Sequence, residues 1–227
     1  MATLNNILAI AETVTINDQK FVGQILSRNQ RISTSEILSV QPFAFEMKPM
    51  NYLLYSQNRN LLSALRVADR EYEQCLNFGT TGWTNYINYQ GDMTQPQLVA
   101  CQFETASANK TIVLGNLPAI TATKYIVKAG DFLQIDRYAY IATADVQRGV
   151  STTVNIPVHR TIMTTLTTPM DAVIGQYGTT QTINGSTYTG ITFPVILQQY
   201  PTYALVPMTN DSFIAWTGTF KAIEAVL

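Results

Sequence analysis

Short runs of strand-forming residues recur along most of the chain, and turn residues separate them. From residue 71 onward, stretches rich in β-branched, aromatic and other apolar side chains follow one another at short intervals. Strands are therefore predicted at residues 75–78, 83–89, 98–103, 111–114, 125–127, 132–135, 138–143, 191–197, 203–207 and 213–227. Val154, Ile156 and Val158 alternate with Asn155 and Pro157, which predicts a further half-buried strand.

The clearest turn signal in the chain is the pair Asn184-Gly185. Strand-forming residues flank it on both sides, over residues 182–188. Both central positions of a type I′ turn need a positive φ, which Asn and Gly adopt readily. The pair therefore predicts a tight β-hairpin.

The N-terminal region predicts a hairpin followed by an exposed arm. Residues 13–17 alternate, Asp18-Gln19-Lys20 supplies a turn, and residues 21–26 supply a second strand. Residues 27–35 are polar and contain Arg28 and Arg31, so we expect an exposed loop or long arm there.

Residues 51–69 contain the one convincing helical pattern. Leu54, Leu61 and Leu65 recur at spacings of seven and four, as on one face of an α-helix. The opposite face carries polar side chains, among them Gln57, Arg59 and Arg66. We expect a helix packed on a sheet, whose polar back either faces water or contacts a neighbouring subunit.

Many short strands and one helix predict a mainly β fold. We expect a β-sandwich or barrel, formed by residues 1–104 and 166–227, with one packed α-helix at about 51–69. Residues 105–165 are predicted to form an inserted β subdomain, a compact set of short strands.

Composition narrows the class of protein. Only 13% of the 227 residues are charged, against about 25% in ordinary soluble domains. Polar uncharged residues fill the deficit, and threonine alone occupies about thirty positions. The net charge is −1, so the chain has no excess of positive charge that would attract duplex DNA or an anionic membrane. No stretch approaches the length of a membrane span, and we expect a protein kept in a soluble compartment.

The signatures of common catalytic sites are absent from the sequence. It contains no GxSxG, HExxH, GxxxxGK[ST] or GxGxxG motif and a single histidine, His159. We therefore predict that the chain is not an enzyme and has no catalytic, cofactor-binding or metal-binding residues.

Two sets of residues allow more than one interpretation. Asp131, Asp136 and Asp145 lie close in sequence, but each occupies a turn-like context, where aspartates accept backbone N–H groups. Cys75 and Cys101 are expected to be buried free thiols, with a disulfide left open only for an oxidising compartment.

Three ordered segments carry a family resemblance. Residues 128–135, which contain Gly130-Asp131-Phe132, are followed by the aromatic stretch 138–146 and by the alternating strand 152–158. Together they resemble a segment of small tail proteins of tailed bacteriophages. In that family the segment forms a β-barrel insertion, so the resemblance implies a sandwich or barrel of the tail-tube type. It carries over no catalytic residues.

The resemblance implies a structural subunit of a phage tail: a tail-tube end, a distal tail protein or a baseplate ring. Its expected partners are copies of itself in a closed six-fold ring and the neighbouring tail or baseplate proteins. DNA would pass through the lumen without sequence-specific binding, no membrane would be involved, and the subunit would reside in the virion after assembly in the host cytoplasm. We expect subunit contacts at Arg28, Arg31, Gln57, Arg59 and Arg66.

Two alternatives remain open at this point. One is another virion component, such as a neck, head-decoration or fibre-base protein. The other is a carbohydrate-binding β module that uses a tyrosine-rich surface formed by Tyr86, Tyr89, Tyr138 and Tyr140.

Overall fold

The computed structural model describes residues 3–18, 22–26, 32–36, 42–67, 72–106, 109–178 and 180–226. The fold is mainly β, with 43% strand, a few short helices and several antiparallel sheets, one of them curled into a half-barrel. The predicted fold class is therefore confirmed at this level.

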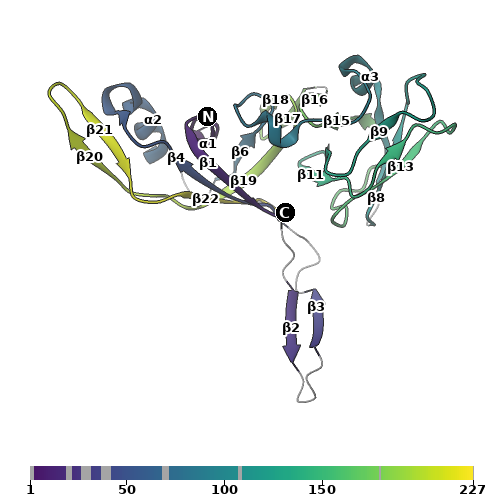
Figure 1. The fold of residues 1–227 in the computed structure, drawn as a ribbon, viewed down its shortest axis with the longest axis horizontal. Helices are drawn as coiled ribbons and strands as arrows, with labels where there is room; N and C mark the ends of the chain where they lie inside the picture. Colours follow the sequence, from purple (N-terminus) through teal and green to yellow (C-terminus); the bar gives the residue numbers. More distant parts are fainter. Residues whose placement is uncertain are drawn as a thin grey trace.

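A five-stranded antiparallel sheet forms the centre of one half of the molecule (Figure 1). Its strands, in spatial order, are β1 (Ala11–Asn17), β4 (Ala44–Pro49), β22 (Phe220–Glu224), β19 (Thr192–Gln199) and β6 (Gln74–Asn77). Helices α1 (Thr3–Ala9) and α2 (Tyr55–Val67) lie over one face of this sheet (Figure 1). Their apolar residues Leu8 and Leu62 join the same buried cluster as Phe45 and Phe220 of the sheet.

Two of these strands continue into a second, smaller sheet. After β19 the chain forms β20 (Tyr203–Pro207), and β21 (Ser212–Trp216) leads back into β22, so a long hairpin joins both sheets. The two-residue strand β5 (Leu53–Leu54) pairs with β21. We call β5, β21 and β20 the hairpin sheet; it extends beyond the five-stranded sheet at one end of the molecule (Figure 1).

The other half of the molecule contains two four-stranded sheets and a two-stranded one. The first has the order β13 (Val154–Pro157), β8 (Thr111–Gly115), β7 (Gln102–Ala106) and β14 (Met170–Asp171). The second has the order β11 (Tyr138–Ile141), β10 (Phe132–Ile135), β15 (Val173–Ile174) and β16 (Tyr177–Gly178). The two-stranded sheet pairs β12 (Val146–Gln147) with β9 (Tyr125–Val127).

Six short elements complete the described structure. Helix α3 (Gln95–Ala100) precedes β7, and a single 3₁₀ turn covers Thr84–Ile87. One hairpin is β17 (Gln181–Ile183) with β18 (Ser186–Tyr188). The other is β2 (Val22–Leu26) with β3 (Ile32–Glu36), and it points away from the sheets (Figure 1).

Buried apolar residues form two clusters, and the first extends from the five-stranded sheet to Phe132, Ala139 and Val173 of the other half. The first contains Phe45, Phe193 and the faces of α1 and α2 that lie on the five-stranded sheet. The second surrounds Leu133 and Tyr140, and it includes Leu98 before the expected insertion and Ile174 after it. The residues that share this cluster therefore extend beyond the interval 105–165 on both sides, while the division into core and insertion stays a prediction.

Several predicted strands agree with the structure. The strands at 125–127, 132–135 and 203–207 are confirmed residue for residue. The Asn184-Gly185 hairpin is also confirmed, with φ of 50° at Asn184 and 73° at Gly185. Both signals are local, which is why sequence alone was sufficient to find them.

The predicted N-terminal hairpin is wrong. β1 pairs with β4, which places Val14 opposite Met47 and Ile16 opposite Phe45 on the helix-covered side of the sheet. The second predicted strand pairs instead with β3, which includes residues 32–35 of the expected arm. Burial of the β1 apolar face against a distant strand outweighs the local turn signal.

The predicted helix begins too early, and it is not the only helix. Residues 53–54 pair with β21 as strand β5, so α2 begins at Tyr55 and runs to Val67; residues 68 and 69 lie outside the described residues. The strand expected at 98–103 is replaced by α3 and the start of β7. A capping box between Thr94 and Gln97, with a proline in the first turn, starts that helix.

Two further strand predictions need correction. Residues 83–89 contain the 3₁₀ turn, held by hydrogen bonds from the backbone N–H and hydroxyl of Thr84 to the carbonyl of Thr81. The single strand predicted at 213–227 is replaced by the two strands β21 and β22, and residue 227 lies outside the described residues. The break falls at Thr217, whose N–H donates to Thr202 where the hairpin passes from one sheet to the other.

Candidate assembly surfaces

The face of the five-stranded sheet that the helices leave open is mainly polar, apart from one apolar row formed by Ala44, Ile223 and Ile196. Alternation along β1, β4 and β22 directs apolar side chains to the helices and polar side chains to the opposite side. We define the polar sheet face by Glu12, Thr13, Thr15, Asn17, Glu46, Lys48, Gln198 and Lys221. It spans strands from both ends of the chain.

Charges on the polar sheet face are balanced by neighbours. The ammonium of Lys48 lies 3.0 Å from a carboxylate oxygen of Glu12, and that of Lys221 lies 3.9 Å from Glu46. All four side chains are about half exposed, so solvent screens both pairs and they contribute little to stability. Their effect is local neutrality: each cation on this face has an anion beside it.

The exposed back of α2 carries three of the predicted contact residues. Gln57, Arg59 and Arg66 are all exposed, as the helical pattern predicted. The guanidinium of Arg66 donates to the Tyr203 hydroxyl at 2.9 Å, which ties the end of α2 to the hairpin sheet. Arg28 and Arg31 lie outside the described residues, so they stay predictions.

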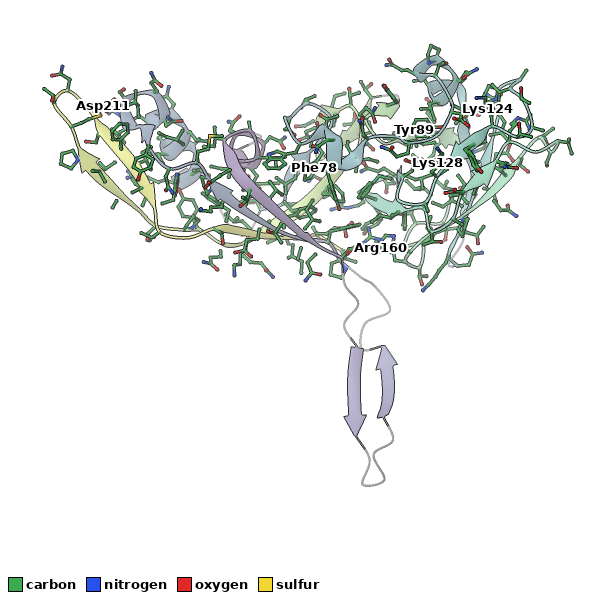
Figure 2. The ribbon with its side chains drawn as sticks, in the orientation of Figure 1. Phe78, Tyr89, Lys124, Lys128, Arg160 and Asp211 are labelled. Carbon is green, nitrogen blue, oxygen red and sulfur yellow. The ribbon has the colours of Figure 1, made fainter. Side chains whose placement is uncertain are left out.

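The start of α2 is held by the turn of the long hairpin. The Asp211 carboxylate accepts the Ser56 hydroxyl at 2.5 Å and the Ser56 N–H at 3.2 Å (Figure 2 labels Asp211). The first N–H groups of a helix lack partners within the helix, and a carboxylate there complements the helix dipole. These donors, with the Ser212 N–H, lower the pKa of Asp211 below its ordinary value.

The two halves of the molecule meet at a buried ion pair. Arg160 comes from the half that contains β13, and Glu224 ends β22 in the five-stranded sheet. The Arg160 guanidinium donates to both carboxylate oxygens of Glu224, at 2.5 and 2.6 Å, and to the Ala139 carbonyl at 2.6 Å. It also lies between two rings, 4.9 Å from the centroid of Phe43 and 5.3 Å from that of Tyr140. Figure 2 shows Arg160 where the two halves adjoin.

A buried amide makes a second connection between the halves. Gln134 of β10 accepts the Thr192 N–H at 2.7 Å and donates to the Thr192 carbonyl at 2.7 Å. The Gln134 side chain thus supplies hydrogen-bond partners for both backbone groups of Thr192, the first residue of β19, as a neighbouring strand would. Gln181 donates to the Gln134 oxygen at 2.8 Å and so fixes the orientation of the amide.

Sequence reasoning missed both connections, although one signal was available for the first. Phe220, Ala222 and Glu224 share the inward face of one strand, so alternation alone places a carboxylate in the core. A buried carboxylate requires a cationic partner. Which cation supplies it could not be predicted, because Arg160 is 64 residues away in sequence.

Two of the three turn aspartates, Asp131 and Asp145, accept backbone N–H groups, as predicted. Asp131 is buried and accepts the N–H groups of Lys128 and Gln90, each at 2.8 Å. Burial raises the pKa of Asp131, opposed by these two hydrogen bonds. Asp145 accepts the Ala129 N–H at 2.9 Å. These carboxylates organise turns, and Asp136 adopts a positive φ of 54° in the turn after β10.

The other residues with reactive side chains are also engaged or buried. Cys75 and Cys101 are free, buried thiols. His159 accepts the Ile141 N–H at its Nδ1 atom, at 2.9 Å. Within the described ranges, no three His, Cys, Asp or Glu side chains come together as a metal would require. None of the described helices is long and apolar enough to cross a membrane.

The tyrosine-rich surface expected from the sequence is not formed. Tyr138 and Tyr140 are buried, and the Tyr86 ring lies 5.0 Å from that of Phe132 beside the first apolar cluster. The Tyr89 hydroxyl donates to the Ile126 carbonyl at 2.5 Å. Tyr86 and Tyr89 are half-buried, so the four residues do not form the exposed tyrosine-rich surface that was expected.

A scan against protein-family models found no match to this chain, and a search of curated proteins likewise found none.

Proposed function

We propose that the chain is a structural subunit of a bacteriophage tail, at the tube end, the distal tail or the baseplate. In this proposal, copies close into a six-fold ring around the DNA channel, and neighbouring tail proteins lie above and below the ring. The proposed fold is a tail-tube-like sandwich or barrel with a β insertion. The proposed location is the virion, and the proposed role is structural rather than enzymatic.

The observation that carries the proposal is the polar sheet face. Duplex DNA binds wherever unpaired Lys and Arg side chains can neutralise its phosphates. Both lysines of this face have a glutamate beside them, and the other members are Thr, Asn and Gln. Such a surface suits a channel through which DNA must slide without being held.

The edges of the same sheet support ring formation. β1 is the edge strand of this sheet among the described strands, and an edge strand can pair with a strand of another chain. A surface of this kind can join a different surface of the next copy, and repeated contacts of that type close into a ring. The exposed Gln57 and Arg59 on the back of α2 offer a polar contact of the same head-to-tail kind.

Electron microscopy of the purified full chain tests the proposal. Negatively stained particles should be rings with a central hole. A gold label attached at Thr15→Cys, on the polar sheet face, should appear inside the hole, whereas a label at Val150→Cys should appear outside it. A stable monomer at about 100 μM, or labels at Thr15→Cys on the outer rim, would contradict the proposal.

A further inference from the structure

Hydrogen bonds within the long hairpin fix which backbone groups of β20 point away from β21. The Thr217 N–H donates to the Thr202 carbonyl, and the Met208 N–H donates to the Asp211 carbonyl, both at 2.9 Å. Bonded and non-bonded residue pairs alternate along an antiparallel ladder, so the even-numbered residues of β20 bond to β21. The backbone groups that point to the outer edge of β20 are therefore those of Tyr203, Leu205 and Pro207.

The outer edge of β20 has the properties of a strand that invites pairing. β20 is the last strand of the hairpin sheet, which extends beyond the five-stranded sheet (Figure 1). None of its five residues is charged. Leu205 and Val206 point to opposite faces of the sheet, and each is 46% exposed. An uncharged and exposed edge strand is a template for a strand of another chain.

Two prolines limit this edge. Proline has no N–H, and its ring occupies the space in which a neighbouring strand would be bonded. Pro207 is exposed and ends β20. Pro201 lies two residues before Tyr203, and a Cβ atom added at Gly218 would lie 3.6 Å from the Pro201 Cβ, so the two residues face each other across the hairpin. The edge therefore has a proline on each side of its outward-pointing N–H groups.

We propose that Pro207 prevents a second copy of this chain from pairing with the outer edge of β20. Two copies of β20 could meet antiparallel, with Leu205 opposite itself and Tyr203 opposite Pro207. In that arrangement three residue pairs would each exchange two hydrogen bonds. The missing N–H of Pro207 removes one bond from two of the three pairs, and its ring faces the Tyr203 carbonyl of the other copy. Self-pairing of this strand is therefore disfavoured.

The two ends of the five-stranded sheet differ in the same respect. At the β6 end, the outward-pointing N–H of Asn77 donates to the Asn5 side chain of α1 at 2.7 Å. At the other end, the Glu224 N–H donates to the Phe43 carbonyl, which sets the alternation along β4 and β1. The β1 residues whose backbone groups point outward are Val14 and Ile16. β1 contains no proline, so of these three edges it is the one that neither a proline nor a described side chain limits.

A second interpretation of Pro207 makes a different prediction. A proline is tolerated on an edge strand because its missing N–H breaks no bond of the ladder, and tolerance alone implies no effect on association. If Pro207 is merely tolerated, restoring an N–H at this position changes nothing. If it prevents pairing, the restored N–H creates a new contact between copies. This difference does not depend on whether the protein forms rings.

Sedimentation equilibrium on the full chain tests the proposal. Pro207→Thr restores the N–H at an exposed position with a residue that favours strands. Pro96→Thr is the matched control, because Pro96 is also exposed but lies in the first turn of α3. Over the same dilution series, Pro207→Thr should reach at least twice the mass of wild type and of Pro96→Thr. Equal masses for all three proteins would overturn the proposal, whether or not microscopy shows rings.

A double variant and hydrogen exchange show whether the new association uses this edge. Leu205→Pro with Pro207→Thr moves the proline to another outward-pointing position, where it breaks no bond to β21. The double variant should keep the wild-type mass. In Pro207→Thr alone, the Leu205 N–H should exchange more slowly in concentrated than in dilute solution, because pairing buries it in a hydrogen bond. A double variant as heavy as Pro207→Thr, or a Leu205 N–H whose exchange does not slow with concentration, would contradict pairing through β20.

Discussion

Replacing Arg160 by methionine should strongly destabilise the protein. Arg160 and Glu224 are 2% and 3% exposed, so the change leaves a carboxylate in the interior without its cation. Of the polar contacts described for the Glu224 carboxylate, only the one from the Phe43 N–H, at 3.0 Å, would remain. Breaking a buried ion pair by removing one partner costs about 3–5 kcal/mol.

This loss of stability should appear as a lower urea concentration at the midpoint of unfolding. With a slope of about 3 kcal/mol/M, the upper end for small proteins, the midpoint should fall by about 1–1.7 M. Fluorescence of Trp83 and Trp216 reports on the half that contains the five-stranded sheet. Far-ultraviolet circular dichroism reports on both halves. Because the ion pair joins the two halves, we also expect the two signals to separate in the variant.

A double variant decides whether the ion pair is the cause. Arg160→Met with Glu224→Leu removes both charges and fills the site with apolar atoms. Replacing a whole buried pair in this way is often neutral or stabilising. The double variant should therefore recover most of the lost stability. If it is as unstable as Arg160→Met alone, the loss comes from packing around Phe43 and Tyr140, and the electrostatic reasoning is refuted.

Three further predictions concern local features. Asp211→Asn should lower the melting temperature at pH 6, and by progressively less as pH falls below the ordinary carboxyl pKa of 3.8, because the carboxylate has a lowered pKa and stabilises the fold only when ionised. Gly149→Ala should cost about 1–2 kcal/mol for its left-handed conformation alone. Gly175→Ala should cost more in the same urea titration, because its Cβ would lie 2.7 Å from the Ile87 carbonyl oxygen; equal costs would contradict this. Burial raises the pKa of Cys101 to about 11, so at pH 8 its thiol should react with a maleimide only after unfolding, and rapid labelling of native protein would contradict its burial.

Sequence reasoning succeeded where the cause of a structure is local. The Asn184-Gly185 turn and the strand at 132–135 depend on conformational preferences and alternation within a few residues. Helix α3 could have been found in the same way, because Thr94, Pro96 and Gln97 form a recognisable start signal. A strand was predicted there from the apolar residues alone, and the capping box that precedes them was overlooked.

Sequence reasoning failed where partners are distant. The residues of β1 suit a hairpin with the next segment as well as they suit β4, and only burial against α1 and α2 decides between them. The polar sheet face is a product of pairing between strands far apart in the chain. Its residues were visible in the sequence, but the rows that they form were not.

The position of β22 in the five-stranded sheet bears on how the protein is made. β22 is the middle strand of that sheet, and it is the last of the described strands to leave the ribosome. Until β22 has been synthesised, β4 has one neighbouring strand instead of two, and Arg160 cannot form its ion pair with Glu224. The sheets built from β7 to β16 close over a continuous stretch of chain and can form during synthesis. A chain cut off before Phe220 would therefore keep that half folded, whereas the five-stranded sheet would lack its middle strand and Arg160 would lack the Glu224 carboxylate.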